Sequence, residues 1–161
     1  MSINKHKSHI LVLPEDDANR QIANGFIRNL NINERAIQIL PLADGWLKAV
    51  DKFVDNYASG MQKYPKRMMV LLIDLDKRKS RLTDVQEDIP DDLKERVFVI
   101  GTRYKPEVLK SFTRMNFEKI GETLAQDCAD NTNHLWGHEE LKHNASELER
   151  MRKSIESFLF I

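Results

Sequence analysis

A short apolar segment in the middle of the chain, ending in two carboxylates, narrows the possible folds more than any other feature. Residues 68–73 are all apolar, and Asp74 and Asp76 follow them. This run is too short, and too closely flanked by charged residues, to cross a membrane. Its length and composition are typical of a strand that is buried on both faces of an α/β sheet. We therefore predict a central strand here.

The two aspartates after this segment predict a metal site. Successive side chains of a strand point to opposite faces, so Asp74 and Asp76 would leave it on the same side while Leu75 points the other way. Two carboxylates held that close need a cation between them. A hard divalent ion with oxygen ligands, Mg²⁺ or Mn²⁺, is the expected one, and it normally needs a third carboxylate from elsewhere in the fold.

The first strand and the acidic residues after it are a candidate source of that third ligand. Residues 9–13 (HILVL) form a compact aliphatic run, and Glu15, Asp16 and Asp17 follow almost at once. We predict a helix over residues 18–30, where the apolar side chains fall on one face. Asp16 or Asp17 can serve as its N-cap, and acids in a first turn are stabilised by the helix dipole. Glu15, at the end of the strand, is left without such a structural role.

The remaining segments alternate between strand and helix patterns. We predict a strand over 36–42, an amphipathic helix over 46–61, a short helix in the charged stretch 77–96, a strand over 97–100, helices after Pro106 and over 117–128, a loop over 130–137 and a last helix over 139–158. This order favours a three-layer Rossmann-like α/β sandwich, with a mostly parallel central sheet of four to five strands, helices on both faces and a helical C-terminal third. We expect a single domain over 1–161, with its core at about 8–102 and a helical extension over 103–161.

Composition argues against some classes of protein. The chain has 25 Lys and Arg residues and 25 Asp and Glu residues, so no net charge attracts nucleic acid or an anionic membrane over long range. Cys128 is the only cysteine, so an intramolecular disulfide is impossible and a reducing cytoplasm is the expected location. Residues 1–9 contain no apolar run, so we expect no signal peptide.

The C-terminal segment leaves the oligomeric state open. The apolar stripe of the last predicted helix, from Leu141 to Phe158, can serve either an internal core or a subunit contact, so a homodimer is one outcome. The apolar residues 158–161 are expected to dock on the body of the protein or to add an edge strand.

Basic residues directly follow the two aspartates. Lys77, Arg78, Lys79 and Arg81 begin a stretch that is almost continuously charged up to residue 96. Such a stretch is usually a solvated face that carries a short helix. Beside a metal site, the same side chains can instead contact the phosphate oxygens of a phosphodiester substrate. Both interpretations stay open, and the second makes nucleic acid a candidate partner.

Histidines and tryptophans give weaker signals. His134 and His138 are four residues apart, a spacing that brings two imidazoles to one metal ion when the segment is helical. Their loop-like surroundings argue against a helix, so we expect hydrogen-bonded or surface histidines. We expect Trp46 and Trp136 to pack in the fold instead of stacking on nucleic-acid bases, because no aromatic residues flank them at regular spacing.

Two motifs together resemble the TOPRIM domain, which occurs in topoisomerases, bacterial primases and small nucleases of the overcoming-lysogenization-defect type. The first motif is residues 13–17 (LPEDD), with an acidic residue at the end of the first strand, and the second is residues 73–76 (IDLD), with an Asp-x-Asp pair after a later strand. The resemblance spans about residues 8–102. Glycine usually follows the glutamate in that family, where this chain has Asp16. Residues 103–161 resemble only the tail of bacterial, cyanobacterial-type proteins of similar size.

The TOPRIM resemblance implies metal-dependent phosphodiester chemistry on nucleic acid. In that interpretation Asp74 and Asp76 hold Mg²⁺ or Mn²⁺, and Glu15 is a third ligand or the general acid/base. Asp17 is a further candidate ligand, because an aspartate two or three places after the glutamate is common in the family. The small size of the chain favours a nuclease-like activity over primase or topoisomerase activity.

A second resemblance is to the receiver domain of response regulators. Residues 10–20 (ILVLPEDDANR) are similar to the start of that domain, in which an acidic pair binds Mg²⁺ and an aspartate after the third strand accepts phosphate. Asp74 matches this phosphoacceptor, and Thr102 matches the hydroxyl residue after the fourth strand. No lysine follows a recognisable fifth strand, however, and Asp76 would add an unusual charge beside a phosphoaspartate. A non-catalytic binding or scaffold protein with the same fold is the third alternative.

Overall fold

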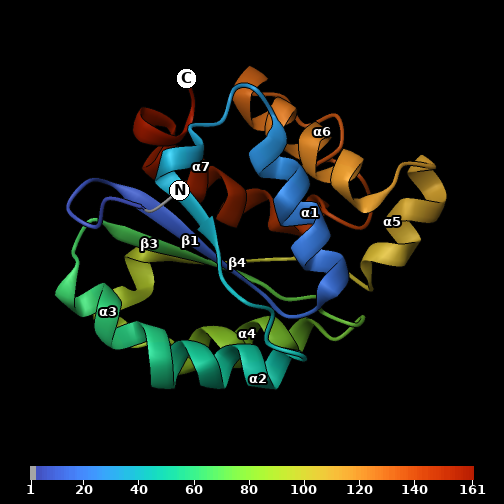
Figure 1. Ribbon diagram of the computed structural model, residues 1–161. Helices are drawn as coiled ribbons and strands as arrows, with labels where there is room; N and C mark the ends of the chain where they lie inside the picture. The colour runs from blue at the N-terminus through green and yellow to red at the C-terminus, as the bar shows by residue number, and fades with distance from the viewer. Residues whose placement is uncertain (1–2) are drawn as a thin grey trace.

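The structure is a computed structural model that describes residues 3–161, and its centre is a parallel β-sheet (Figure 1). The strands are β1 (His9–Pro14), β2 (Ile37–Ile39), β3 (Arg67–Leu72) and β4 (Val97–Ile100). Their order across the sheet is β2-β1-β3-β4, and every neighbouring pair is parallel. The predicted α/β class is therefore confirmed, with four strands in the sheet of the described residues.

Helices cover both faces of the sheet, which makes three layers (Figure 1). One face carries α1 (Asp17–Arg28), α5 (Pro106–Thr113), α6 (Phe117–Asp130) and α7 (Ala145–Leu159), which we call the upper layer. The other face carries the lower layer, α2 (Trp46–Lys52), the π-helical turn η2 (Phe53–Tyr57), α3 (Ala58–Lys63) and α4 (Lys79–Asp88). Short 3₁₀ turns are η1 (Glu34–Ala36), η3 (Asp91–Arg96) and η4 (Lys142–Asn144). Within residues 3–161, no helix combines the length and the apolar character that crossing a bilayer requires.

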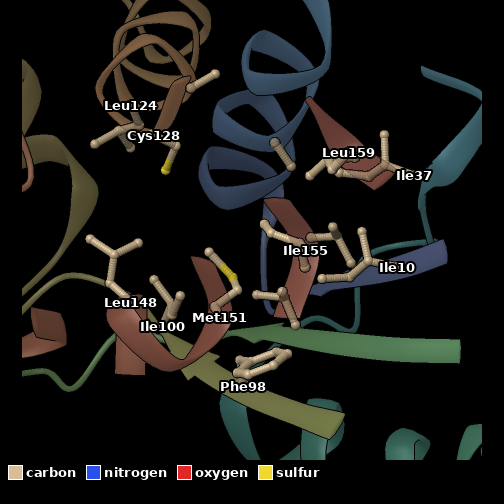
Figure 2. Packing of buried hydrophobic residues seen from close by; sticks show 14 of the residues in the cluster. Ile10, Ile37, Phe98, Ile100, Leu124, Cys128, Leu148, Met151, Ile155 and Leu159 are labelled. Atoms are coloured by element: carbon tan, nitrogen blue, oxygen red, sulfur yellow. The ribbon is translucent and has the colours of Figure 1, made fainter. Parts of the chain in front are cut away.

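The first strand, β1, supplies side chains to two separate cores. All six of its residues are buried, as expected for a strand with a neighbour on each side and a helix layer on each face. Because side chains alternate, Ile10 and Val12 enter the upper core, whereas Leu11 and Leu13 enter the lower core. Figure 2 shows the upper core, where Ile10 faces side chains of α7.

In the upper layer, α1 and α6 approach each other at backbone distance. Gly25 of α1 and Gly121 of α6 are both buried. A β-carbon on Gly121 would collide with the carbonyl oxygen of Ile22, and one on Gly25 would collide with that of Glu118. Only glycine allows such an approach without displacing the neighbouring backbone. This contact fixes the position of α6 above the sheet.

The C-terminal third of the chain completes the upper core. Leu148, Met151 and Ile155 of α7 are buried, so the apolar stripe of this helix forms part of the internal core (Figure 2). The helix begins at Ala145, so the predicted start at residue 139 is wrong. The preceding residues form turns, and Asn144 at their end donates a side-chain hydrogen bond to the Gly101 carbonyl oxygen at 2.9 Å.

The end of the chain docks on the body of the protein, as predicted. Phe160 forms an isolated antiparallel bridge with Ile32. The amide of Ile161 donates to the carbonyl oxygen of Asn31 at 2.9 Å. The terminus is thus tied to the segment between α1 and β2.

The outer side of the edge strand β4 is covered by side chains of α7. The Val99 amide donates to the Glu147 carboxylate at 2.9 Å, and the Arg150 guanidinium donates to the Val97 carbonyl oxygen at 2.7 Å. Buried backbone groups need hydrogen-bond partners, and here charged side chains supply them. These side chains take the place of the fifth strand that the upper end of the predicted range allowed.

Two element boundaries in the first half differ from the predicted ones. β2 has three residues instead of spanning 36–42, because Ala36 belongs to a 3₁₀ turn and Pro41 has no amide hydrogen to donate to a ladder. The helix predicted over 46–61 is continuous through α2, η2 and α3, and it ends at Lys63.

Candidate metal centre

The carboxyl ends of β1 and β3 bring two buried carboxylates together. The strands pair in register up to Pro14 and Leu72, and the Glu15 amide then donates to the Leu72 carbonyl oxygen at 3.0 Å. The Asp74 amide donates to the Glu15 carboxylate at 2.6 Å. Glu15 is 7% exposed and Asp74 is 5% exposed. The structure therefore places these two predicted site residues side by side at one rim of the sheet.

Asp16 supplies a third carboxylate at the same place. It is the N-cap of α1, and its side chain accepts hydrogen bonds from the backbone and side-chain nitrogens of Asn19, each at 3.0 Å. The side chain of Asn19 also donates to Asp74 at 2.8 Å. One buried amide group therefore links the helix cap to the end of β3.

The other oxygen of Asp74 is held by the segment that follows β4. Thr102 donates to it twice, through its amide at 3.0 Å and through its hydroxyl at 2.8 Å. Gly101 allows this close approach, because a β-carbon there would collide with the carbonyl oxygen of Ile73. Both carboxylate oxygens of Asp74 are thus hydrogen-bonded, which fixes the orientation of the side chain.

The carboxylates of Glu15, Asp16 and Asp74 form a group that fits a metal ion. One oxygen atom from each lies within 4.8 Å of the others. Anionic oxygen donors are the ligands that hard divalent cations such as Mg²⁺, Mn²⁺ and Ca²⁺ prefer. The donor set therefore suits a divalent cation without selecting among these ions.

Burial shifts the ionisation of this group. It raises the pKa of Glu15 to about 8, and the neighbouring carboxylates of Asp74 and Asp16 raise it further, against a hydrogen bond from the Asp74 amide. Burial also raises the pKa of Asp74 to about 6, against the hydrogen bonds from Thr102 and Asn19. A nearby cation favours the charged forms of carboxyl groups and would lower both values. Carboxyl groups perturbed in this way are common at functional sites.

Asp76 lies outside the group of three carboxylates. β3 ends at Leu72, and the backbone turns at Asp76 and Lys77, whose φ angles are 51° and 62°. The alternation that predicted a shared direction for Asp74 and Asp76 therefore does not extend to Asp76. Its side chain is 53% exposed and lies 3.9 Å from Arg81.

Asp17, the other predicted ligand, also lies outside the group. It is exposed on the first turn of α1, where it accepts hydrogen bonds from Arg20 at 2.8 Å and from Gln21 at 2.7 Å. These bonds lower the pKa of Asp17. The structure therefore gives this carboxylate a place on the helix surface, beside the site but directed to other partners.

Arg81 connects the charged stretch to the carboxylate group. Its guanidinium donates to the backbone oxygen of Asp74 at 2.9 Å and lies over the Trp46 ring, 4.7 Å from the ring centroid. The side chain is 12% exposed, and its buried Nε has no hydrogen-bond partner among the described residues. A fixed positive charge therefore stands at the edge of the acidic group.

The three basic residues before Arg81 are exposed. Lys77 lies over the ring of Tyr104, 4.4 Å from its centroid, and Arg78 and Lys79 begin α4. Exposed cations at the rim of the sheet fit both the solvated-face and the phosphate-contact interpretations. The structure does not separate the two.

Two polar residues of the site carry roles that the sequence does not reveal. The prediction that Asp16 or Asp17 caps α1 is confirmed for Asp16, but its place beside Glu15 depends on the fold. Asn19 stands three residues after the cap, where a side chain can reach back to it, and that spacing was an available signal. Its bond to Asp74 crosses 55 positions of sequence and has no local signal.

The weaker candidates have structural surroundings. His138 accepts a hydrogen bond from the Glu140 amide at 3.1 Å, and His134 is exposed. Neither belongs to a group of potential metal ligands in the part of the chain that the structure describes. Trp136 is buried and donates to the Leu124 carbonyl oxygen at 3.1 Å, as predicted for a packing residue.

Comparisons with known proteins give no match for this chain. No protein-family model, no curated protein and no solved structure is significantly similar to it. A functional conclusion therefore depends on the geometry and the chemistry of the carboxylate group.

Proposed function

We propose that this protein uses a divalent cation, Mg²⁺ or Mn²⁺, for phosphodiester chemistry on nucleic acid, in the manner of a nuclease. The main support is the group of Glu15, Asp16 and Asp74, whose carboxylate oxygens lie within 4.8 Å of one another. Open parallel α/β sheets bind their ligands at the carboxyl ends of the strands, where this group lies. In this proposal the three carboxylates hold the ion, whose chemistry is to stabilise negative charge on a phosphodiester.

Glu15 suits a role in proton transfer as well as in ion binding. A general acid or base works best when its pKa lies near the operating pH, and burial raises the pKa of Glu15 to about 8. The bond from the Asp74 amide, at 2.6 Å, fixes the direction of the Glu15 carboxylate. Glu15 would then take a proton from an attacking water molecule or give one to the leaving oxygen.

Arg81 suits the phosphate group of a substrate. Guanidinium groups form charge-assisted hydrogen bonds with phosphate oxygens, and a side chain that is already fixed loses little freedom on binding. Arg81 is fixed by the Trp46 ring and by the Asp74 backbone oxygen. Lys77 and Arg78 would add exposed charges nearby. Since the chain has no net charge, binding would depend on this local arrangement.

A phosphoacceptor protein of the receiver type is the second candidate. The two hydrogen bonds from Thr102 to Asp74 favour it, because the receiver resemblance implies a hydroxyl residue beside the acceptor aspartate. The presence of Asp16 beside Glu15 also favours it, because an acidic pair then accompanies Asp74. A phosphoacceptor, however, needs a free carboxylate oxygen for attack, and Asn19 and Thr102 occupy both. A metal ligand can keep these bonds, because each oxygen has a second lone pair.

Thermal unfolding with added Mg²⁺ or Mn²⁺ tests the proposed ligands. An ion that binds only the folded chain raises its stability, by about 2.7 kcal/mol at 100 times the dissociation constant. Asp16→Asn keeps a good N-cap side chain but removes a ligand charge, so we expect it to lose this stabilisation. Asp17→Asn is the matched control, since Asp17 lies outside the group. An equal metal response in both variants would contradict the proposed ligand set.

Two activity assays separate the candidate functions. We expect the wild-type protein to nick plasmid DNA, or to cleave single-stranded DNA or RNA, in the presence of Mn²⁺, and Asp74→Asn to lose this activity. A receiver-type protein would instead gain mass when incubated with a small phosphodonor. Intact Mn²⁺ binding without cleavage of any of these substrates would sink the nuclease-like proposal.

A further inference from the structure

The upper core contains a cavity with a volume of about 90 Å³. It lies between the sheet and helices α1, α6 and α7, and its walls include Ile10, Ala23, Leu124, Met151 and Ile155. Figure 2 shows four of these side chains, those of Ile10, Leu124, Met151 and Ile155, in this part of the core. Each wall residue named here is at most 5% exposed. The cavity is therefore inside the molecule and not on its surface.

The chemistry of its walls determines what the cavity can hold. The walls are largely apolar, and Asn19 and Thr102 use their side-chain hydrogen-bond donors on Asp74. A buried water molecule needs about two to four polar partners, which such walls do not supply, whereas an apolar cavity of about 150 Å³ binds benzene or xenon. Pockets for drug-sized ligands and cofactors have at least about 300 Å³. The cavity thus suits a small apolar molecule and excludes a nucleotide.

The helices around the cavity are held in place by contacts with backbone. The helices α1 and α6 already touch at Gly25 and Gly121, so they cannot move closer together. The helix α7 is held to the edge of the sheet by Glu147 and Arg150. A cavity persists when its surroundings relax only partly, and these contacts limit relaxation.

We propose that this cavity binds a small apolar molecule, of the size of xenon or a short hydrocarbon, and that its occupancy changes the affinity of the carboxylate group for its ion. Asn19 and Thr102 line the cavity, and the same side chains donate to the two oxygens of Asp74, at 2.8 Å each. An occupant that displaces either side chain therefore displaces the carboxylate. The link to ion affinity rests on the proposed function, whereas the cavity site does not.

Xenon under pressure tests the cavity site in the full-length protein. We expect saturable NMR shifts for the methyl groups of Ile10, Leu124 and Ile155, which line the cavity. We expect none for Leu11 and Leu13, which belong to the lower core. The absence of any saturable shift, or equal shifts in both cores, would overturn the site.

A matched pair of variants tests its location. Ala23→Val adds volume at the cavity wall, and Ala58→Val makes the same change in the lower core, away from the cavity. We expect Ala23→Val to lose the xenon shifts without a lower melting temperature. We expect Ala58→Val to keep the shifts and to melt earlier, because added volume in a well-packed core is destabilising. Undiminished xenon binding in Ala23→Val would overturn the location.

Mn²⁺ titration of the same variants tests the link to the carboxylate group. We expect the Mn²⁺ dissociation constant of Ala23→Val to differ from the wild-type value by about fivefold or more, and that of Ala58→Val by less than about twofold. An unchanged constant in Ala23→Val would overturn the link and leave the xenon site intact. No Mn²⁺ binding by the wild-type protein would overturn the proposed function and the link together, while the xenon shifts would still decide the cavity site.

Discussion

Asp74 is held in one orientation by hydrogen bonds from protein groups alone. Asn19 and Thr102 donate to its two oxygens, and its amide donates to Glu15. Partners of this kind commonly change metal affinity or activity by about 10-fold to 100-fold when they are removed. The carboxylate is therefore oriented before an ion or a substrate arrives, which lowers the entropy cost of binding.

The raised pKa values at the site predict how stability depends on pH in metal-free buffer. Burial raises the pKa of Glu15 from 4.5 to about 8 and that of Asp74 from 3.8 to about 6. Between these values the folded state binds protons that the unfolded state has released, so the free energy of unfolding falls as pH rises. The loss begins near the unfolded values and is complete above about pH 8, at about 1.4 kcal/mol for each unit of pKa shift.

Denaturant titration in the presence of a chelator, between about pH 5 and about pH 9, measures this dependence. Glu15→Gln cannot ionise, so we expect its stability to vary less with pH than that of the wild-type protein. Saturating Mn²⁺ favours the ionised carboxylates, so we expect it to stabilise the protein more at the alkaline end. A variant profile as steep as the wild-type one would show that Glu15 does not carry the effect.

At the scale of elements, the contact between α1 and α6 limits side-chain size. Gly121→Ala places a methyl group against the Ile22 carbonyl oxygen, so we expect the free energy of unfolding to fall by about 1–3 kcal/mol. Gly60→Ala is the matched control, because Gly60 is also helical but a β-carbon there meets only the Arg67 side chain, at 3.0 Å. We expect the control to be neutral or up to about 1 kcal/mol more stable, since alanine favours helix.

Denaturant titration of the two glycine variants gives both numbers. A Gly121→Ala variant as stable as the wild-type protein would mean that the two helices separate at little cost. In that case α6 would not be held above the sheet by this contact, and the walls of the cavity would be free to adjust.

Local patterns predicted most elements of the fold, and the failures have a common cause. The runs 68–73 and 97–100 matched β3 and β4 closely, because strands buried on both faces leave a continuous apolar signal. The start of α7 was wrong because residues before it are recruited by distant backbone groups. Glu140 accepts a hydrogen bond from the amide of Tyr104, 36 positions away, and Asn144 bonds to Gly101, 43 positions away. Periodicity carries no information about such contacts.

The candidate site was predictable to the same extent. The meeting of Glu15 and Asp74 follows from parallel strands that end at one rim. The departure of Asp76 depends on a left-handed backbone at Asp76 and Lys77, which neither residue type announces, because glycine is the usual residue in that conformation. Asp16 joins the group because a residue that caps a helix directly after a strand must place its carboxylate at the strand end.

At the scale of the whole molecule, the C-terminal third is part of the core. Side chains of α6 and α7 pack with those of β1 in a single upper cluster. We therefore expect a chain that ends at residue 105 to lose native packing, because the upper face of the sheet would be exposed to water. Near-ultraviolet circular dichroism and dye binding to exposed apolar surface measure this loss.

The control for that truncation is a chain that lacks only residues 160 and 161. It loses the bridge between Phe160 and Ile32 but keeps α7, so we expect it to stay folded with a small loss of stability. Cooperative unfolding of the shorter chain, with a native near-ultraviolet signal, would show that the first 105 residues are an independent folding unit.

The hydrogen bonds that Glu147 and Arg150 make to β4 also bear on how this protein behaves at high concentration. An uncovered edge strand offers its backbone groups to strands of other copies, and such pairing starts aggregation. Resistance to aggregation thus depends on one helix staying docked. Transient detachment of α7, well short of complete unfolding, is enough to open the sheet to amyloid-like growth.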